Sequence, residues 1–117
     1  MGDRAKRKPY DRLGEFELSL LIAVAHLADE AYGLRIRREI ERRTGRHVAI
    51  GALYTSLNRL EDKRYVRSRM SESLPQRGGR PRRHYELTKA GEEALRQSYK
   101  RLTEMWKGLP SALLRLT

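Results

Sequence analysis

The sequence predicts a mainly α fold with one small β-hairpin, in the order helix, helix, helix, hairpin, helix. Apolar residues recur at helical spacing within residues 14–28, 33–44 and 50–63. Two alternating segments then flank a loop rich in glycine and proline within residues 65–87, and a heptad pattern follows over residues 88–109. At 117 residues the chain is long enough for one core and too short for two independent domains.

The charge of the chain limits the class of its partner. There are 26 Lys and Arg against 15 Asp and Glu, a formal net charge of +11, which favours a polyanion such as nucleic acid or an anionic membrane surface. The apolar run from Phe16 to Ala28 contains Glu17 and His26, is too short to span a bilayer, and lacks a signal-cleavage site. We therefore expect a cytoplasmic, nucleoid-associated protein with no membrane partner.

The first predicted helix follows a basic arm, residues 1–12, that contributes almost nothing apolar. Within residues 14–28, apolar side chains cover most of the helix circumference, which is more than one buried face needs. This surplus predicts contact with a partner subunit as well as a core, and we assign Leu20 to that subunit interface. A second helix over residues 33–44 ends at Gly45, a residue typical of helix C-termini.

The third predicted helix, residues 50–63, has two distinct faces. Leu53, Leu57 and Leu60 form one apolar stripe, while small and polar residues lie opposite. Because the second and third helices meet across a short turn that contains glycine, the pair resembles a helix-turn-helix. We take the exposed face of the third helix as a candidate binding surface: Gly51, Ala52, Thr55, Asn58 and Arg59.

The predicted hairpin, residues 65–87, is dense in arginine. Between Arg64 and Arg83 the sequence has seven arginines and a single acid, Glu72. Such a density is costly unless an anion relieves it. The alternative is an edge hairpin that carries charge to prevent aggregation.

The last predicted helix begins at Thr88, a plausible N-cap, and carries a heptad seam. The seam predicts a symmetric homodimer in which this helix provides the interface residues Leu95, Tyr99, Leu102 and Trp106. Gly108 and Pro110 end the regular helix. The domain organisation is thus a compact unit over residues 13–87, a dimerisation helix over 88–109 and a short tail over 110–117.

The order of these elements is that of a winged helix-turn-helix, in which the third helix enters the major groove of DNA. Gly51, Ala52 and Thr55 are small enough for close approach to base edges, Asn58 suits adenine and Arg59 suits guanine. The hairpin arginines can follow a phosphate backbone or enter a minor groove. An ordinary solvated helix face is the alternative for the third helix.

Three separated motifs add a family resemblance. Residues 31–34, 51–61 and 77–91 are similar to the PadR family of transcriptional regulators. The resemblance implies a homodimeric repressor of the compact subgroup, with a single C-terminal dimerisation helix. It also implies that Tyr54 contacts DNA together with the wing arginines Arg77, Arg80, Arg82 and Arg83. We thus expect a repressor that binds a palindromic operator in double-stranded DNA.

Two positions depart from the family pattern. Arg64 stands where glycine is usual, so either a left-handed residue there costs roughly 1 kcal/mol or the turn differs. Ala49 stands where a Ser or Thr cap is common, so the third helix lacks a side-chain cap or is capped otherwise.

Other classes of function have weaker support. No catalytic motif, metal-ligand spacing or cofactor fingerprint is present, and the chain has no cysteine, so we expect neither an enzyme nor a metal or cofactor. The main alternative is a nonspecific nucleic-acid-binding protein, either architectural or RNA-binding, because net charge alone suits it equally. A third class is a ligand sensor in which Trp106 and Tyr99 line a dimer cavity for a small planar effector. Aromatic residues in a heptad seam are more often packing residues.

Overall fold

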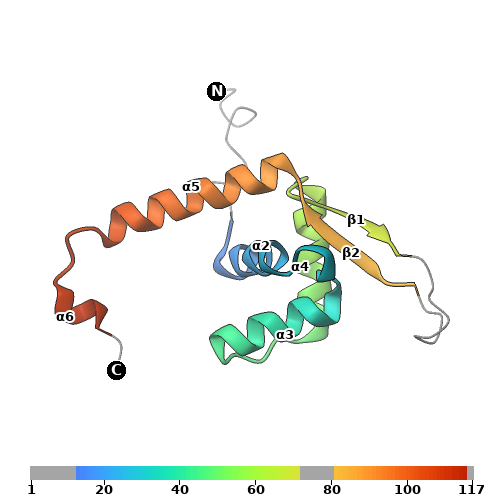
Figure 1. Ribbon diagram of the computed structural model, residues 1–117, viewed down its shortest axis with the longest axis horizontal. Helices are drawn as coiled ribbons and strands as arrows, with labels where there is room; N and C mark the ends of the chain where they lie inside the picture. The colour runs from blue at the N-terminus through green and yellow to red at the C-terminus, as the bar shows by residue number, and fades with distance from the viewer. Residues whose placement is uncertain (1–12, 72–80, 116–117) are drawn as a thin grey trace.

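The computed structural model describes residues 13–71 and 81–115 (Figure 1). The predicted arm, residues 1–12, and the wing residues Arg77 and Arg80 lie outside this part of the chain. The helices and strands follow in the order α2 (Glu15–Leu27), η2 (Ala28–Glu30), α3 (Gly33–Thr44), α4 (Ile50–Asp62), β1 (Val66–Met70), β2 (Arg83–Leu87), α5 (Lys89–Trp106) and α6 (Ser111–Leu114).

Helix α2 lies at the centre of the fold, in contact with α3, α4, α5 and β2. Its residues Leu20, Leu21, Ala23 and Val24 are buried by these elements of the same chain. The assignment of Leu20 to a subunit interface is therefore wrong: its side chain is fully buried and leaves no surface for a partner. The apolar surplus of α2 is explained mostly by its central position, and Ile22, 39% exposed, is the large apolar side chain of this helix left at the surface.

Helices α3 and α4 form the helix-turn-helix. Ile36 and Ile40 of α3 pack with the predicted leucine stripe of α4, which is fully buried. Helix α3 ends at Gly45, whose φ of 74° is the left-handed C-terminal conformation that glycine permits. Both family departures have a structural outcome: no side chain caps α4 at Ala49, and Arg64 takes a φ of 67° despite its Cβ, at a cost of roughly 1 kcal/mol.

Strands β1 and β2 form the antiparallel hairpin, in which Val66 pairs with Leu87 and Met70 with Arg83. The base of the hairpin is tied to the body of the fold by the segment before α3. The amide of Tyr85 donates to the carbonyl of Ala31 at 2.8 Å, and Tyr32 forms an isolated bridge with His84. This third, short pairing sets the position of the wing relative to α3.

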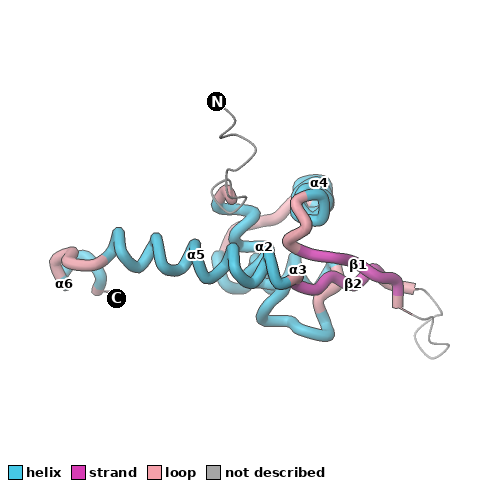
Figure 2. Tube along the Cα trace, turned by 90° about the horizontal axis from the view of Figure 1, so that it is seen from above, coloured by secondary structure: helices cyan, strands magenta, loops and turns pink. Residues whose placement is uncertain are grey.

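Helix α5 begins as predicted, with the Thr88 hydroxyl accepting from the Gly91 amide at 3.0 Å. Gly91 is needed there, because a Cβ at this position would lie 2.0 Å from the Tyr65 carbonyl oxygen. Only the first half of the helix packs on the core, through Gly91, Ala94 and Ser98. The second half projects from the body on the side away from the wing (Figures 1 and 2).

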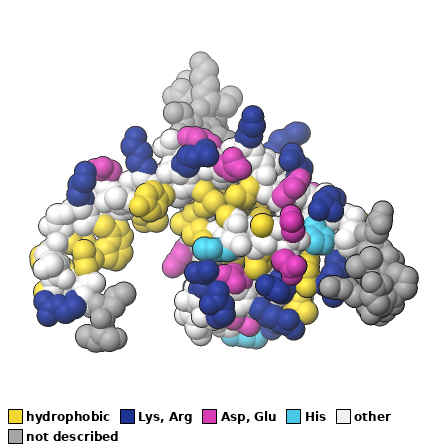
Figure 3. Space-filling model, in the orientation of Figure 1, with side chains coloured by type: hydrophobic (Ala, Val, Ile, Leu, Met, Phe, Trp, Pro, Cys, Tyr) yellow, Lys and Arg dark blue, Asp and Glu magenta, His cyan; other side chains and the backbone are white. Residues whose placement is uncertain are grey.

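All residues from 99 to 115 are exposed, and seven of them are large and apolar: Tyr99, Leu102, Met105, Trp106, Leu109, Leu113 and Leu114. The tail that follows Pro110 contains a short helix, α6, for which the sequence alone had indicated no definite structure. Hydrophobic side chains gather on the inner side of the curve made by α5 and α6 (Figure 3). Across residues 13–71 and 81–115, no helix is long and apolar enough to cross a membrane.

Candidate nucleic-acid interface

The outer face of α4 presents the residues that the sequence singled out. Gly51, Ala52, Thr55, Asn58 and Arg59 are all exposed, whereas the opposite stripe is buried. At 100° per residue, Gly51, Thr55 and Asn58 lie at the middle of this face, with Ala52 and Arg59 along one flank. The arrangement leaves a small, polar ridge free to approach a groove of a duplex.

The two flanks of α4 differ. Arg59 lines an open hollow beside the start of α2, together with Glu15 and Glu17. Glu17 itself is half-buried and pairs with Lys63, with Nζ and Oε1 2.9 Å apart. On the other flank Tyr54 faces α3 and the wing. The sequence-predicted set is therefore split between two sides of one helix, with Thr55 and Asn58 between them.

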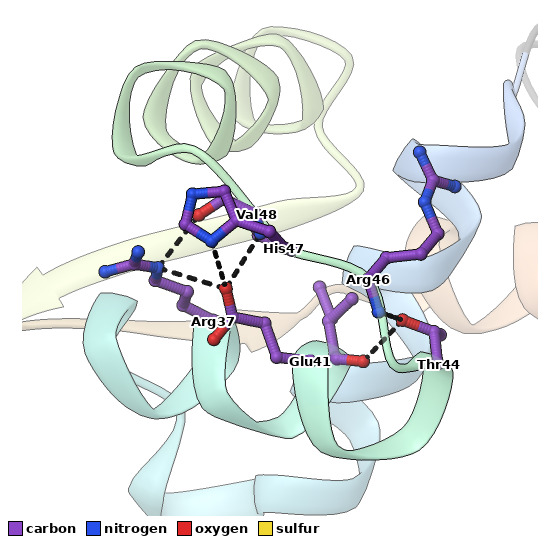
Figure 4. A network of polar contacts seen from close by, with 7 residues as sticks. Arg37, Glu41, Thr44, Arg46, His47 and Val48 are labelled. Atoms are coloured by element: carbon purple, nitrogen blue, oxygen red, sulfur yellow. Dashed lines mark hydrogen bonds and ion pairs between the residues drawn. The ribbon is translucent and has the colours of Figure 1, made fainter.

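The turn between α3 and α4 is held by a polar network centred on Glu41 (Figure 4). The Val48 amide donates to Glu41 Oε2 at 2.8 Å, and Arg37 Nε donates to the Val48 carbonyl at 2.8 Å. Arg37 and His47 also lie within ion-pair distance of Glu41, at 3.5 and 3.3 Å. The hydrogen bond from Val48, helped by the charges of Arg37 and His47, lowers the pKa of Glu41 against the opposing effect of burial.

Glu41 was missed by the sequence analysis, because an acceptor seven residues before its donor follows no recognised capping pattern. Its position has a clear consequence. The carboxylate accepts a hydrogen bond from the Val48 amide, just before α4 begins at Ile50, and so fixes the direction in which α4 follows the turn. Glu41 thus fixes the residue before the N-cap Ala49, while the first turn of α4 itself has no side-chain cap.

Ion pairs neutralise some arginines and leave others uncompensated. In α3, Arg35 pairs with Glu30, Arg37 with Glu41, and both Arg42 and Arg43 with Glu39. The hydrogen bond from Arg43 is the main cause that lowers the pKa of Glu39. Within the described part of the chain, the arginines on or beside α4 and the wing that have no carboxylate partner include Arg38, Arg59, Arg64, Arg69, Arg82 and Arg83.

Arg82 and Arg83, the two predicted wing contacts that the structure describes, are held by different neighbouring side chains. Arg82 lies over the ring of Tyr32, with its guanidinium carbon 4.3 Å from the ring centroid. Arg83 donates to the Ser68 hydroxyl at 2.9 Å, and that hydroxyl in turn donates to Glu61 of α4 at 2.8 Å. Both arginines are exposed and keep further N–H donors for an anion. The wing and α4 are therefore connected by side chains as well as by the backbone.

The exposed seam of α5 forms a second surface, distinct from the basic one. Leu95 is partly buried against the core, whereas Tyr99 is 74%, Leu102 44% and Trp106 54% exposed. A groove between α2 and the same helix is lined by Ile22, Ser98, Leu102 and Met105 among others. No group of His, Cys, Asp or Glu among residues 13–71 and 81–115 has a geometry that could hold a metal ion.

Comparison with known proteins agrees with this geometry. The family model described as "Transcriptional regulator PadR-like family" matches residues 21–97. No curated protein matches the sequence significantly. Among solved structures, RosR from H. salinarum is similar at 27% identity and a TM-score of 0.66, covering 86% of this chain and 83% of that one.

Two further structures are similar over most of their length. A PadR-like transcription factor from Bacteroides fragilis shares 27% identity at a TM-score of 0.61, covering 90% of this chain and 95% of that one. A PadR-like transcriptional regulator from Bacillus cereus has the same fold at 22% identity and a TM-score of 0.65, covering 87% and 93%. The family match spans well over half of the chain, and the winged helix-turn-helix with its C-terminal helix is the fold of these regulators. This chain belongs to the PadR-like family of transcriptional regulators, DNA-binding proteins that are not enzymes.

Proposed function

We propose that the chain is a cytoplasmic, sequence-specific repressor that binds a palindromic operator as a homodimer. Helix α4 enters the major groove, and the wing lies along the adjacent backbone. The observation that carries the proposal is the exposed ridge of α4, with Thr55 and Asn58 at its middle, beside arginines that lack carboxylate partners. A ridge of this kind supplies both the base contacts and the phosphate contacts of a specific complex.

Dimerisation is part of the proposal because of the apolar surface on α5 and α6. A monomer would leave Tyr99, Leu102, Trp106 and four further large apolar side chains in water. Contiguous apolar surface of this kind marks an interaction site. A heptad seam that meets its own copy would cover these side chains around a two-fold axis, and two α4 helices would then read two related half-sites.

The direct test is footprinting of the purified chain on the DNA around its own promoter. We expect a symmetric protected site with two half-sites one or more helical turns apart. In vitro transcription from that promoter should fall as the site is filled, which tests repression separately. Uniform coverage of all DNA, without a preferred site, would instead favour the nonspecific nucleic-acid-binding alternative.

A planar effector is the second part of the proposal. Tyr99 and Trp106 lie one heptad apart on the exposed seam, so a two-fold axis near them would bring aromatic side chains from two subunits together. Aromatic faces bind flat, cationic compounds by stacking and cation–π attraction. An effector bound there would act on the geometry of the dimer and so on the spacing of the two α4 helices.

A further inference from the structure

We propose that the groove between α3, α4 and the wing holds one phosphodiester of the DNA backbone in each half-site, bound by Arg38 and Arg82. In this site Tyr32 is a positioning residue that holds Arg82 in place. The inference rests on the proposed function and adds to it a defined phosphate site, including two residues, Tyr32 and Arg38, that the sequence did not single out.

The groove has the chemistry of an anion site. It is lined by Tyr32 and Arg38 from the α3 side, Tyr54 from α4, and Arg82 and Arg83 from the wing. None of the described residues that line it is acidic. Three arginines and two tyrosines therefore line one groove, and guanidinium and phenol groups are hydrogen-bond donors suited to phosphate oxygens.

Arg82 is held in a defined position before any ligand binds. Its guanidinium lies over the Tyr32 ring at 4.3 Å, and Tyr32 makes an edge contact with His84, with ring centroids 5.6 Å apart. Stacking on an aromatic face leaves the N–H donors at the edge of the guanidinium plane free. Because Tyr32 is also bridged to β2 through the backbone, it connects the position of this arginine to both α3 and the wing.

Arg38 differs from its neighbours in α3. Arg35, Arg37, Arg42 and Arg43 each have a carboxylate partner, whereas Arg38 is exposed and makes no ion pair with any described residue. Helix α3 therefore has an excess of positive charge at Arg38, where it borders the groove. A phosphate would supply the missing counter-charge.

The location favours DNA as the source of the phosphate over a free anion. Tyr54 lines the groove and also stands on the flank of the exposed face of α4, so the groove opens beside the surface proposed to meet the duplex. A backbone that runs past α4 toward the wing would pass its mouth. A phosphate contact at this point would set the register of α4 without reading sequence.

Salt dependence of operator binding tests the site. Arg38→Ala removes two contacts per dimer and should reduce the slope of log affinity against log salt by about 1.8. Arg35→Ala, one turn earlier and already paired with Glu30, is the matched control and should leave the slope unchanged. Tyr32→Leu should lower the slope while Tyr32→Phe, which keeps the ring under Arg82, should retain it. Thermal unfolding checks that every variant is folded.

A neutral methylphosphonate placed singly along the operator backbone identifies the phosphate. At one position in each half-site we expect the wild type to lose about tenfold in affinity, and the Arg38→Ala variant, in which only Arg82 still contacts that phosphate, to lose clearly less. If the Arg38→Ala variant keeps the wild-type slope and every methylphosphonate costs both proteins equally, the phosphate site is overturned although operator binding stands. Saturable binding of inorganic phosphate at micromolar concentration, with an unchanged slope, would assign the groove to a free anion and also overturn it. If the wild type protects no symmetric site at all, the proposed function itself fails.

Discussion

The phenol of Tyr54 lies directly against Gly33, so that a Cβ built at Gly33 would be 2.0 Å from the phenol oxygen and 2.7 Å from the ring carbon that carries it. Gly33 is the buried first residue of α3, and Tyr54 is 41% exposed on α4. Because Gly33 has no side chain, the phenol of Tyr54 can lie against it, and this packing fixes the direction of the Tyr54 side chain. This contact sets the one aromatic ring on the exposed side of α4.

We expect Gly33→Ala to change DNA binding more than stability. The methyl group displaces the far end of an exposed ring, which can swing toward solvent, and alanine favours the helical backbone over glycine by roughly 0.5–1 kcal/mol. The unfolding free energy should therefore change by less than about 1 kcal/mol, while operator affinity falls several-fold. Thermal unfolding and a DNA-binding titration measure the two effects.

Gly51→Ala is the control for the stability effect. A Cβ at Gly51 meets nothing within 4 Å, so this variant should gain the helical preference without moving Tyr54. A loss of more than about 3 kcal/mol in Gly33→Ala would show that the α3–α4 packing yields instead of the ring. Unchanged operator affinity would show that the direction of Tyr54 does not matter.

Glu41 should make the helix-turn-helix sensitive to acid. Because its pKa is lowered in the folded chain, the carboxylate stabilises the fold at pH values above the ordinary range for glutamate, and this contribution is lost as the pH falls through the folded pKa. Glu41→Gln should be less stable than the wild type at pH 7. The difference should shrink below about pH 4, where the wild-type carboxyl becomes protonated.

Urea unfolding of both proteins across pH 3 to 7 measures this difference. Glu104→Gln is the control: Glu104 is exposed on the projecting part of α5 and pairs with Lys107 at 3.3 Å, an arrangement that contributes little to stability. A Glu41→Gln difference that stays constant with pH would mean that Glu41 acts through packing and not through its charge.

Helix boundaries were predictable where a local rule determines them. The bounds of α3 agree with the predicted range because a left-handed glycine, Gly45, ends that helix, and α5 starts where Thr88 caps it. Helix α6 was not predictable in this way. Four residues after Pro110 are too few to show a period.

Contacts between distant residues were not predictable. Apolar periodicity reports how much of a helix circumference is covered, and it does not say which chain covers it, so Leu20 was misassigned. The candidate residues on α4 followed from one helical period. The stacking of Arg82 on Tyr32 depends on how the wing returns to the start of α3, which no local pattern encodes.

The exposed seam of α5 predicts the behaviour of Leu102→Asp. A carboxylate at the centre of an apolar dimer interface would be buried without a partner, so this variant should sediment as a monomer. It should remain folded, because the residues through which α5 packs on the core are Gly91, Ala94, Leu95 and Ser98, and Leu102 lies beyond them. Lys100→Asp, exposed on the other side of the same helix, should stay dimeric. A wild-type chain that sediments as a monomer at tens of micromolar would contradict the dimer.

Trp106 is the single tryptophan of the chain, so its fluorescence reports on the proposed effector site without interference. Planar cationic dyes should quench or shift its emission and weaken operator binding at the same concentrations. The monomeric Leu102→Asp variant should lose this response, because the site needs both subunits. If neither the emission nor operator binding changes across a panel of such dyes, Trp106 serves as a packing residue in the dimer.

The last prediction concerns the reading of bases by the exposed ridge of α4. Asn58 lies at the middle of the exposed face, beside Thr55, with no bulky neighbour at Gly51 to keep it from a base edge. Asn58→Ala should relax the preference at one operator position in each half-site by about 1 to 3 kcal/mol while weak nonspecific binding remains. Arg59→Ala should act in the same way at another position if its side chain turns from the hollow beside α2 into the groove. Titrations against a set of single-base operator variants separate the two possible roles, since equal losses on operator and random DNA would assign either residue to the phosphate backbone, which carries no sequence information.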